Sequence, residues 1–361
     1  MKLILLLPNQ KSRYSDLYNV YDDLYKALLN LNIDVKIVGI NDNNVNTFIY
    51  NDLEIINRFE LINFIGLNEK NYIVTVDDFN ILRELQKIKV SNNIIIWVHY
   101  FYGHKFLFKK YRNIDKNFNI NIGKILLFKI ISLIPISIRF LLSKFYYKTL
   151  SHNFVIAQSI WTSLLVERVY NVKVRGLLYI PVNSDIYNVD LDLKRNNILI
   201  FLGDYTDTSL KSLYSIIKII NNEYNNIKYD YFGDKNTGIV FENEFKIKLS
   251  YLGKLERPEL SKVYNRHILT ITPIYNGNFE MVPIQSLLCG TPVISYIQPF
   301  MEITNDNLMI ANINNLNDVK DKINKWKYID TNIREEIKAR ILKVMDNKIV
   351  ANKLLEYIKE L

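Results

Sequence analysis

The residues best suited to chemistry lie in one stretch, 273–295, with the sequence PIYNGNFEMVPIQSLLCGTPVIS. Its pattern predicts the end of a strand, a loop, a short helix over 284–289, a tight turn and another strand. Pro283 fits the first turn of a helix, and Gly290 is typical of a helix end. The polar loop 276–280 therefore leads into a helix N-terminus. Such an end offers unpaired N–H groups and the positive end of a dipole, which together bind a phosphate group.

A histidine at the end of an expected strand is the second candidate. The apolar run 94–98 is typical of a buried parallel strand, and His99 follows it directly. In open α/β sheets, ligands bind beyond the carboxyl ends of the strands, which would allow His99 to contact a substrate. The alternative is a histidine that is hydrogen-bonded inside a loop, and the sequence leaves both interpretations open.

Doubly wound α/β structure would position these residues. A strand at 3–7, a helix at 15–32 and a strand at 35–38 open such a domain, and the runs 73–76 and 94–98 add two more strands. No G-x-G-x-x-G follows the first strand, so this is not a dinucleotide-binding fingerprint.

Composition narrows the class of protein. The chain has 361 residues, 49% of them hydrophobic, which is enough for two domains with a core each. The single cysteine, Cys289, excludes an internal disulfide bond, fits a reducing compartment and is expected to be a buried structural thiol. The apolar run 3–7 is too short for a secretory signal, so we expect a cytoplasmic protein.

The net charge of +9 is compatible with nucleic acid, an anionic membrane or a phosphorylated small molecule as partner. The sequence has no zinc-ligand cluster, no RNP-like motif and no long basic tail, so we expect no nucleic-acid partner.

The stretch 273–295 also resembles a known motif. Family 4 retaining glycosyltransferases, which have the GT-B fold, carry the donor-site pattern E-G-F-G-L-V-P-x-E-A-x-x-C-G-T-P-V. The two glutamates of the family fall on Gly277 and Gln285, and Glu280 stands where the family has glycine. The positions that match are Phe279, Val282, Pro283, Cys289, Gly290, Thr291, Pro292 and Val293.

This resemblance implies a fold and a division of the chain. The fold would be α/β and GT-B, with two Rossmann-like doubly wound domains facing a central cleft. An N-terminal acceptor-binding domain would cover residues 1–182, followed by a linker over 183–197. A C-terminal nucleotide-sugar-binding domain would cover 198–335, and a terminal helix over 336–361 would cross back to the N-terminal domain.

The resemblance also implies roles for individual residues. His99 would contact the sugar being transferred. The first glutamate of the family touches the donor sugar, which Gly277 cannot do; our own expectation is that Glu280 supplies this carboxylate from a shifted backbone. Lys211 would neutralise the donor diphosphate, Leu252 would lie near the base, and Gln285 would bind the ribose. The expected donor-binding residues are Gly203, Lys211, Leu252, Gly277, Asn278, Phe279, Met281, Val282 and Gln285.

The function that the resemblance implies is transfer of a sugar from a nucleotide sugar to a glycan or glycolipid, by a retaining, hexosyltransferase-type enzyme. The nucleotide sugar is a co-substrate, and no cofactor or metal is expected. The D-x-D formed by Asp190 and Asp192 lies in the polar linker and predicts solvated charge. The replacements at 204, 277 and 285 favour an alternative, a catalytically inactive GT-B protein that binds nucleotide sugars. A GT-B enzyme outside the family, such as a phosphorylase or epimerase, is a third interpretation.

Residues 122–150 form a long apolar segment, interrupted by Lys124, Lys129 and Arg139 and divided by Pro135. A charge near the bilayer centre costs about 2.5–3.5 kcal/mol, and a single span would separate strands of one sheet, so we expect no span here. Two interpretations stay open: a kinked helix pair that covers the N-terminal sheet, or interfacial helices that dip into anionic lipid. The second would place the protein peripherally on the inner face of the membrane, beside a lipid-linked acceptor.

Overall fold

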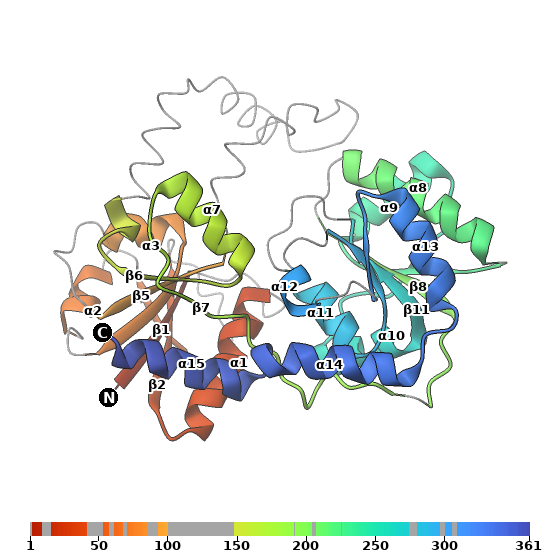
Figure 1. Ribbon diagram of the computed structural model, residues 1–361. Helices are drawn as coiled ribbons and strands as arrows, with labels where there is room; N and C mark the ends of the chain where they lie inside the picture. Colours follow the sequence, from red (N-terminus) through yellow and green to blue (C-terminus); the bar gives the residue numbers. More distant parts are fainter. Residues whose placement is uncertain are drawn as a thin grey trace. The chain divides into compact units, whose positions relative to one another are not determined.

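A computed structural model of the protein describes residues 2–8, 16–41, 53–57, 61–67, 71–85, 93–99, 148–190, 192–203, 207–224, 226–273, 280–296, 300–304 and 309–361. The chain divides into two compact units (Figure 1). The first consists of Met1–Val182 and Asn347–Leu361, and the second is Asn183–Asp346. Val182 is also the residue at which the sequence places the end of the N-terminal domain.

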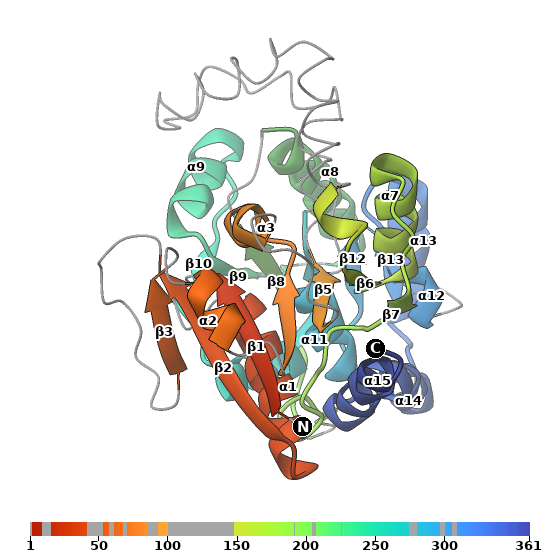
Figure 2. The same ribbon diagram turned by 90° about the vertical axis from the view of Figure 1, so that its left-hand side faces the viewer.

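The first unit is built on a parallel sheet whose described strands have the order β3-β2-β1-β4-β5-β6-β7 (Figure 2). Residues 3–7 of β1 and all of β5 are buried because each is an unbroken apolar run, as parallel strands covered on both faces require. The strand order changes direction between β1 and β4. The strands are β1 (Lys2–Pro8), β2 (Asp34–Asn41), β3 (Leu53–Asn57), β4 (Tyr72–Val76), β5 (Ile94–Val98), β6 (Phe154–Ala157) and β7 (Gly176–Leu177).

In the first unit, α1 follows β1, α2 follows β3, α3 follows β4 and α7 follows β6. The expected helix over 15–32 is α1, and Ser159 caps α7 by accepting a hydrogen bond from the N–H of Thr162 at 3.0 Å. α15 packs against α1. The described helices of this unit are α1 (Asp16–Asn30), α2 (Leu61–Leu67), α3 (Phe79–Leu85), α7 (Ile160–Tyr170) and α15 (Asn347–Lys359).

The second unit repeats this plan with the strand order β10-β9-β8-β11-β12-β13, all parallel. This is the doubly wound order, and the direction changes between β8 and β11. α8 packs beside α13, and α11 packs beside α10 and α14. The strands are β8 (Asn197–Leu202), β9 (Tyr229–Gly233), β10 (Ser250–Tyr251), β11 (His267–Ile271), β12 (Val293–Ser295) and β13 (Ile310–Asn312). The described helices are α8 (Asp207–Glu223), α9 (Lys235–Phe245), α10 (Arg257–Arg266), α11 (Met281–Leu288), α12 (Met301–Thr304), α13 (Leu316–Trp326) and α14 (Thr331–Met345).

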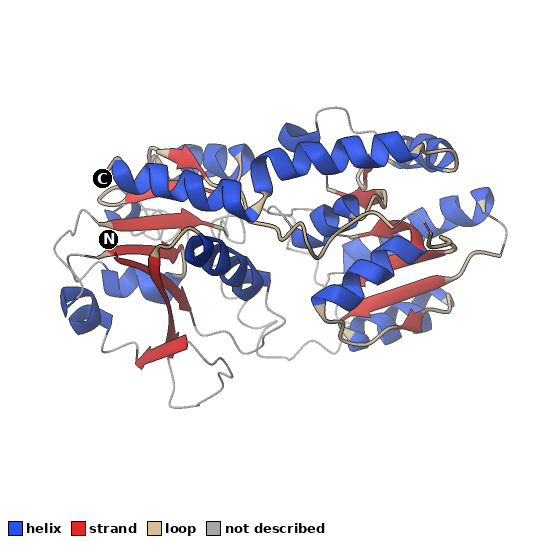
Figure 3. Cartoon of the chain, turned by 90° about the horizontal axis from the view of Figure 1, so that it is seen from below, coloured by secondary structure: helices blue, strands red, loops and turns tan. Residues whose placement is uncertain are grey.

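The expectation of one terminal helix over 336–361 is wrong. Two helices, α14 and α15, occupy this end, and Figure 3 shows the loop that separates the helix beside the label C from the one before it. Asp346 lies between them with a non-helical backbone (φ −53°, ψ 135°). α14 packs on α11 and α12, whereas α15 packs on α1, so only the chain from Asn347 returns to the first unit. The apolar positions keep a helical spacing across the break, which is why the pattern does not reveal it.

The predicted linker, 183–197, belongs to the second unit and is not a free connection. Residue 197 opens β8, and we call the preceding residues, 183–196, the strap. The N–H of Asp190 donates to Oδ1 of Asn265 at 2.9 Å, and Nδ2 of Asn265 donates to the carbonyl of Asn188 at 2.8 Å. The backbone of the strap is therefore bonded to the domain, while most of its polar side chains are exposed.

Most of the apolar segment 122–150 lies outside the described residues, which resume at Lys148. Of the helices that the structure does describe, none is both long enough and apolar enough to cross a membrane.

Candidate functional site

The candidate site lies at the carboxyl edge of the second sheet, where the strand order changes direction. Gly203 follows β8 directly and Thr272 follows β11, the two strands on either side of this point. Open α/β sheets bind their ligands at such switch points. The hydroxyl of Thr272 donates to that of Ser295, which ends β12, at 2.7 Å. The edge therefore has a polar floor that two neighbouring strands share.

The helix that follows β11 begins at this edge. α11 starts at Met281, three residues earlier than the pattern predicts, and Glu280 before it is extended (φ −91°, ψ 142°). The first N–H groups of an α-helix have no intrahelical partners, and Pro283, as a proline, has no backbone N–H. The N–H groups of Met281 and Val282 are therefore the ones that this helix end offers to an anion.

The opposite end of α11 is held by an arginine from the strap. Arg195 donates to the carbonyls of Cys289 (2.9 Å) and His267 (3.3 Å), to Oδ1 of Asn265 (3.2 Å) and to the hydroxyl of Thr291. Burial and a second guanidinium nearby lower the pKa of Arg195 to about 10, so it carries its charge at neutral pH. A cation at this end complements the negative end of the helix dipole.

The second guanidinium belongs to Arg334 of α14, which donates to the carbonyl of Gly290. Gly290 has φ +66°, and an added Cβ would lie 3.1 Å from Cβ of Arg334 and 3.2 Å from Cγ2 of Val189. The prediction that Gly290 ends the helix is confirmed. It is glycine both because the backbone is left-handed and because the arginine packs closely against it.

Hydroxyl groups fix the side of α11 that faces the sheet. Ser286 donates to the hydroxyl of Thr270 on β11 (2.8 Å) and lies 3.0 Å from the carbonyl of Thr291. Thr291 in turn donates to the carbonyl of Tyr264 on α10 at 2.8 Å. All four residues are buried. The position of the helix is thus set by directional bonds as well as by apolar packing.

One polar side chain of α11 lies on the face of the first turn. Gln285 is four residues after Met281, so the two are neighbours along the helix. Its Oε1 accepts a hydrogen bond from the hydroxyl of Tyr264 at 3.3 Å, and the side chain is 6% exposed. No described residue accepts a hydrogen bond from its Nε2.

The two-sheet arrangement is also found in solved structures. Sucrose-phosphate synthase from Thermosynechococcus elongatus has a TM-score of 0.68 at 13% identity, with 99% of this chain and 98% of that chain covered. The lipopolysaccharide outer core galactosyltransferase WaaB has a TM-score of 0.67 at 12% identity, with both chains covered completely. A TarM variant from S. aureus has a TM-score of 0.67 at 9% identity, with 99% of each chain covered. The chain has the GT-B fold. No protein-family model matches the sequence, and no curated protein sequence matches it significantly.

Of the other predicted donor residues of this GT-B chain, those that the structure describes lie at the same carboxyl edge of the second sheet. Gly203 follows β8, and Leu252 follows β10, with its N–H donating to the carbonyl of Tyr231 at 2.8 Å. Lys211 is on the second turn of α8 and is exposed. Gly277, Asn278 and Phe279 lie outside the described residues.

The first unit of the GT-B fold places His99 at the carboxyl end of β5. Its backbone N–H donates to Oδ1 of Asp77 at 2.9 Å, and its carbonyl accepts from Nε2 of Gln158 at 2.6 Å. The side chain is 3% exposed and packs edge-on against Trp97, with ring centroids 4.2 Å apart, and near Tyr21 at 6.1 Å. The imidazole therefore points into the domain core.

Burial controls the ionisation of this cluster. It lowers the pKa of His99 to about 3, so the ring is neutral at physiological pH. It also raises the pKa of Tyr21 well above its ordinary value, and the charge of Asp77 adds to this. Nε2 of His99 and the hydroxyl of Tyr21 are fully buried without a hydrogen-bond partner among the described residues. An enclosed water would satisfy the hydrogen-bonding capacity of these two atoms.

A histidine–carboxylate pair of the second unit lies at the amino edge of its sheet, opposite the candidate site. His267 opens β11, and its Nε2 is 3.0 Å from Oδ2 of Asp230 near the start of β9. Burial would raise the pKa of Asp230, but hydrogen bonds from His267 and from Asn197 lower it below its ordinary value. These residues join the amino ends of three strands, and we interpret them as structural.

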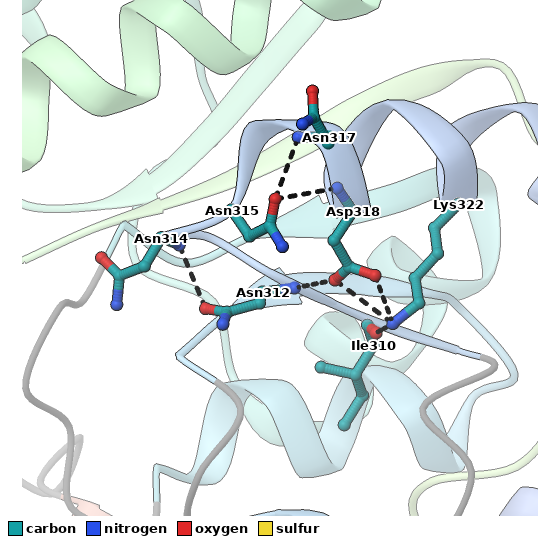
Figure 4. A network of polar contacts seen from close by, with 7 residues as sticks. All are labelled: Ile310, Asn312, Asn314, Asn315, Asn317, Asp318 and Lys322. Carbon is teal, nitrogen blue, oxygen red and sulfur yellow. Dashed lines mark hydrogen bonds and ion pairs between the residues drawn. The ribbon is translucent and has the colours of Figure 1, made fainter.

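The outermost strand also ends in a polar network (Figure 4). Oδ1 of Asn315 accepts from the N–H groups of Asn317 and Asp318, both at 3.2 Å, and so caps α13. Nζ of Lys322 is 3.1 Å from Asp318 and donates to the carbonyl of Ile310. Every contact here satisfies the chain itself, so the network stabilises the strand end.

The expected D-x-D behaves as part of the strap. The carboxylate of Asp190 accepts from the N–H of Asp192 at 3.0 Å and closes a turn. Among the described residues, no three His, Cys, Asp or Glu side chains come together as a metal ion would need. Burial raises the pKa of Cys289 to about 11, which agrees with the expected structural thiol.

Sequence reasoning missed two residues of this region, Arg195 and Tyr264, as members of the site. Arg195 lies in a polar run with no periodic signal, so nothing in the pattern assigns it to the end of α11. Tyr264 lies at a recognisable position, the buried end of α10, but only the structure brings its hydroxyl to Gln285.

Proposed function

We propose that the protein is a retaining glycosyltransferase of the family 4 type, which transfers a hexosyl group from a nucleotide sugar to a glycan or glycolipid. The observation that carries the proposal is the geometry of α11. Its open N–H groups lie at the switch point of a GT-B sheet, and two arginines hold its other end. This geometry suits a bound diphosphate.

Two proteins of the same fold support the choice of ligand. The TarM structure contains UDP, and an E. coli protein with a TM-score of 0.64 is bound with UDP-2-fluoro glucose. The match between residues 273–295 and the family 4 donor motif extends this ligand class to the present chain.

The proposed chemistry is electrostatic. The bond between C1 of the sugar and the diphosphate oxygen breaks, and its electron pair remains on the diphosphate. C1 forms a bond to a hydroxyl oxygen of the acceptor, and the proton of that hydroxyl passes to the departing diphosphate. The N–H groups of Met281 and Val282 and the charge of Lys211 would stabilise this developing charge. With these groups in place we expect no requirement for a divalent ion.

Two carboxyl-edge residues would act on the sugar. The family resemblance assigns His99 a contact with the sugar, but its ring faces the domain core, so this contact requires the ring to turn outward. With a pKa of about 3, the ring would be neutral there at physiological pH. Glu280 directly precedes α11, and we expect its carboxylate to approach the donor sugar.

Turnover of nucleotide sugars tests the proposal. The wild type, incubated with a panel of UDP-, GDP-, ADP- and dTDP-sugars and with soluble or lipid-linked glycans, should release the diphosphate in the presence of EDTA. His99→Ala should lower kcat/KM by roughly tenfold or more, because a transition-state hydrogen bond is lost. His152→Ala, which changes an exposed histidine, is the matched control.

Each result has a defined meaning. Unchanged turnover in folded His99→Ala removes His99 from the reaction. Tight nucleotide binding without transfer or hydrolysis across the whole panel favours the inactive nucleotide-sugar-binding protein, for which Gly277 and Gln285 are the sequence support. Dependence on a divalent ion overturns the metal-independent mechanism.

A further inference from the structure

We propose that Tyr264 is a positioning residue of the donor site, whose hydroxyl fixes the carboxamide of Gln285 so that its NH2 group donates to an oxygen of the nucleotide. This inference rests on the proposed function and concerns the same site. It adds a residue from α10 and a direction for the hydrogen bond.

The hydrogen-bonding groups of Gln285 are divided between two sides. Oε1 accepts from the hydroxyl of Tyr264 at 3.3 Å, and no described residue accepts from Nε2. An amide has two N–H donors on nitrogen and acceptor lone pairs only on oxygen. With the oxygen engaged from inside the domain, the group that is left for a ligand is a donor.

The neighbours of Gln285 place that donor near an anion. Gln285 lies one turn after Met281 and Val282, whose N–H groups begin α11. An NH2 group beside open N–H groups favours an acceptor oxygen, as a ribose or a diphosphate presents. The carboxylate that the family 4 pattern has here can only accept, so this chain would contact its nucleotide with the opposite polarity.

Tyr264 is rigid enough to impose the orientation. It is fully buried, and its ring meets that of Phe232 edge-on with centroids 6.4 Å apart. Its carbonyl accepts from the hydroxyl of Thr291 at 2.8 Å. These contacts belong to the ring and the backbone, so Tyr264→Phe keeps them and removes only the hydroxyl.

The chain offers a matched control. The hydroxyl of Tyr229, on β9, donates to Oδ1 of Asn221 on α8 at 2.6 Å. This is the same kind of bond, from a tyrosine hydroxyl to a side-chain amide oxygen. Tyr229 opens its strand, so the bond lies at the amino edge of the sheet, away from the candidate site. Tyr229→Phe therefore reports the cost of losing such a bond where no nucleotide is expected.

The experiment is a double-mutant cycle on nucleotide affinity. Calorimetry with UDP, GDP, ADP and dTDP first identifies the best ligand of the wild type. Tyr264→Phe should raise the Kd for that ligand roughly 3- to 10-fold, because the amide of Gln285 is no longer held in one orientation. In a Gln285→Met background, which keeps the volume but lacks the amide, the same change should have no effect. Tyr229→Phe should leave Kd unchanged.

Where the enzyme turns over, the donor KM should rise by the same factor with kcat unchanged, since binding is lost equally in the ground state and the transition state. An unchanged Kd in Tyr264→Phe overturns the inference, as does an equal loss in the Gln285→Met background, which would mark Tyr264 as merely structural. If the wild type binds none of the four nucleotides, the proposed function fails together with the inference. If it binds one and the cycle shows no coupling, only the inference fails.

Discussion

The carboxyl edges of the two sheets are built from opposite kinds of chemical group. In the first unit, His99 and Tyr21 are titratable, buried and packed against Trp97. In the second, the groups of α11 that we propose to contact the nucleotide are backbone N–H groups and the amide of Gln285, which do not titrate. The charges proposed at this edge, on Lys211 and Glu280, lie outside α11. At the first edge, burial keeps the titratable groups neutral, and this costs stability. At the second edge, the positive potential comes from the backbone of α11.

This difference separates stability from binding. A charge on the buried groups of the first edge lowers the stability of the fold, because no solvent is present to stabilise it. The N–H groups at the start of α11 and the amide of Gln285 do not change charge across the physiological pH range. Their contribution to nucleotide affinity should therefore change little with pH. Three substitutions test this separation, in order of decreasing effect.

Arg195→Met should cause the largest change, in the second unit. It leaves the carbonyls of Cys289 and His267 without their charged donor, which we expect to cost about 3 kcal/mol in the free energy of unfolding. Urea unfolding measures the loss. Nucleotide affinity should fall as well, because α11 loses the cation that holds its end.

The control for this change is Arg340→Met on α14. Arg340 is 34% exposed and pairs with Glu336 one turn away, an interaction worth less than about 0.5 kcal/mol. An Arg195 variant no less stable than this control would contradict the interpretation of the strap as a clamp on α11.

His99→Phe should remove a pH dependence from the first unit. The folded pKa of about 3 lies below the ordinary value of 6.5, so below pH 6.5 the unfolded state binds a proton that the folded state does not. Stability is therefore complete above that pH and is lost as the pH falls. Between about pH 7.5 and pH 5.5 the loss is about 1.4 kcal/mol.

The measurement is urea unfolding of wild type and His99→Phe at both pH values, with His152→Phe, at an exposed position, as control. We expect the wild type and the control to lose stability between the two values and His99→Phe to lose about 1.4 kcal/mol less. The same pH dependence in all three proteins would show that His99 is not the group responsible.

How far the sequence predicts this molecule depends on the kind of signal. Unbroken apolar runs such as IIIWV predict their strands correctly because a parallel strand is buried on both faces. The edge strand β3 is missed, since 53–57 is short and lies in a polar region. The break at Asp346 is missed because helical spacing continues across it.

The candidate site is predictable where it depends on the backbone and not where it depends on tertiary contacts. Pro283 and Gly290 mark α11 because proline and glycine restrict or permit particular backbone angles. Nothing local shows that Arg195 reaches α11, or that the ring of His99 turns inward. Such contacts depend on packing between segments that are far apart in the chain.

Lys211→Ala should have the smallest effect, on ligand binding alone. Lys211 is exposed on the second turn of α8, so solvent weakens its attraction for a diphosphate, and we expect a loss of affinity of roughly 2- to 5-fold. The loss should disappear at high salt, which screens exposed charges but not the N–H groups of α11. Lys218→Ala, two turns along the same helix, where the ammonium stacks on Tyr214, is the control. If the two variants bind the nucleotide equally well at low salt, the positive potential at this edge comes from groups other than Lys211, and α11 becomes the principal source.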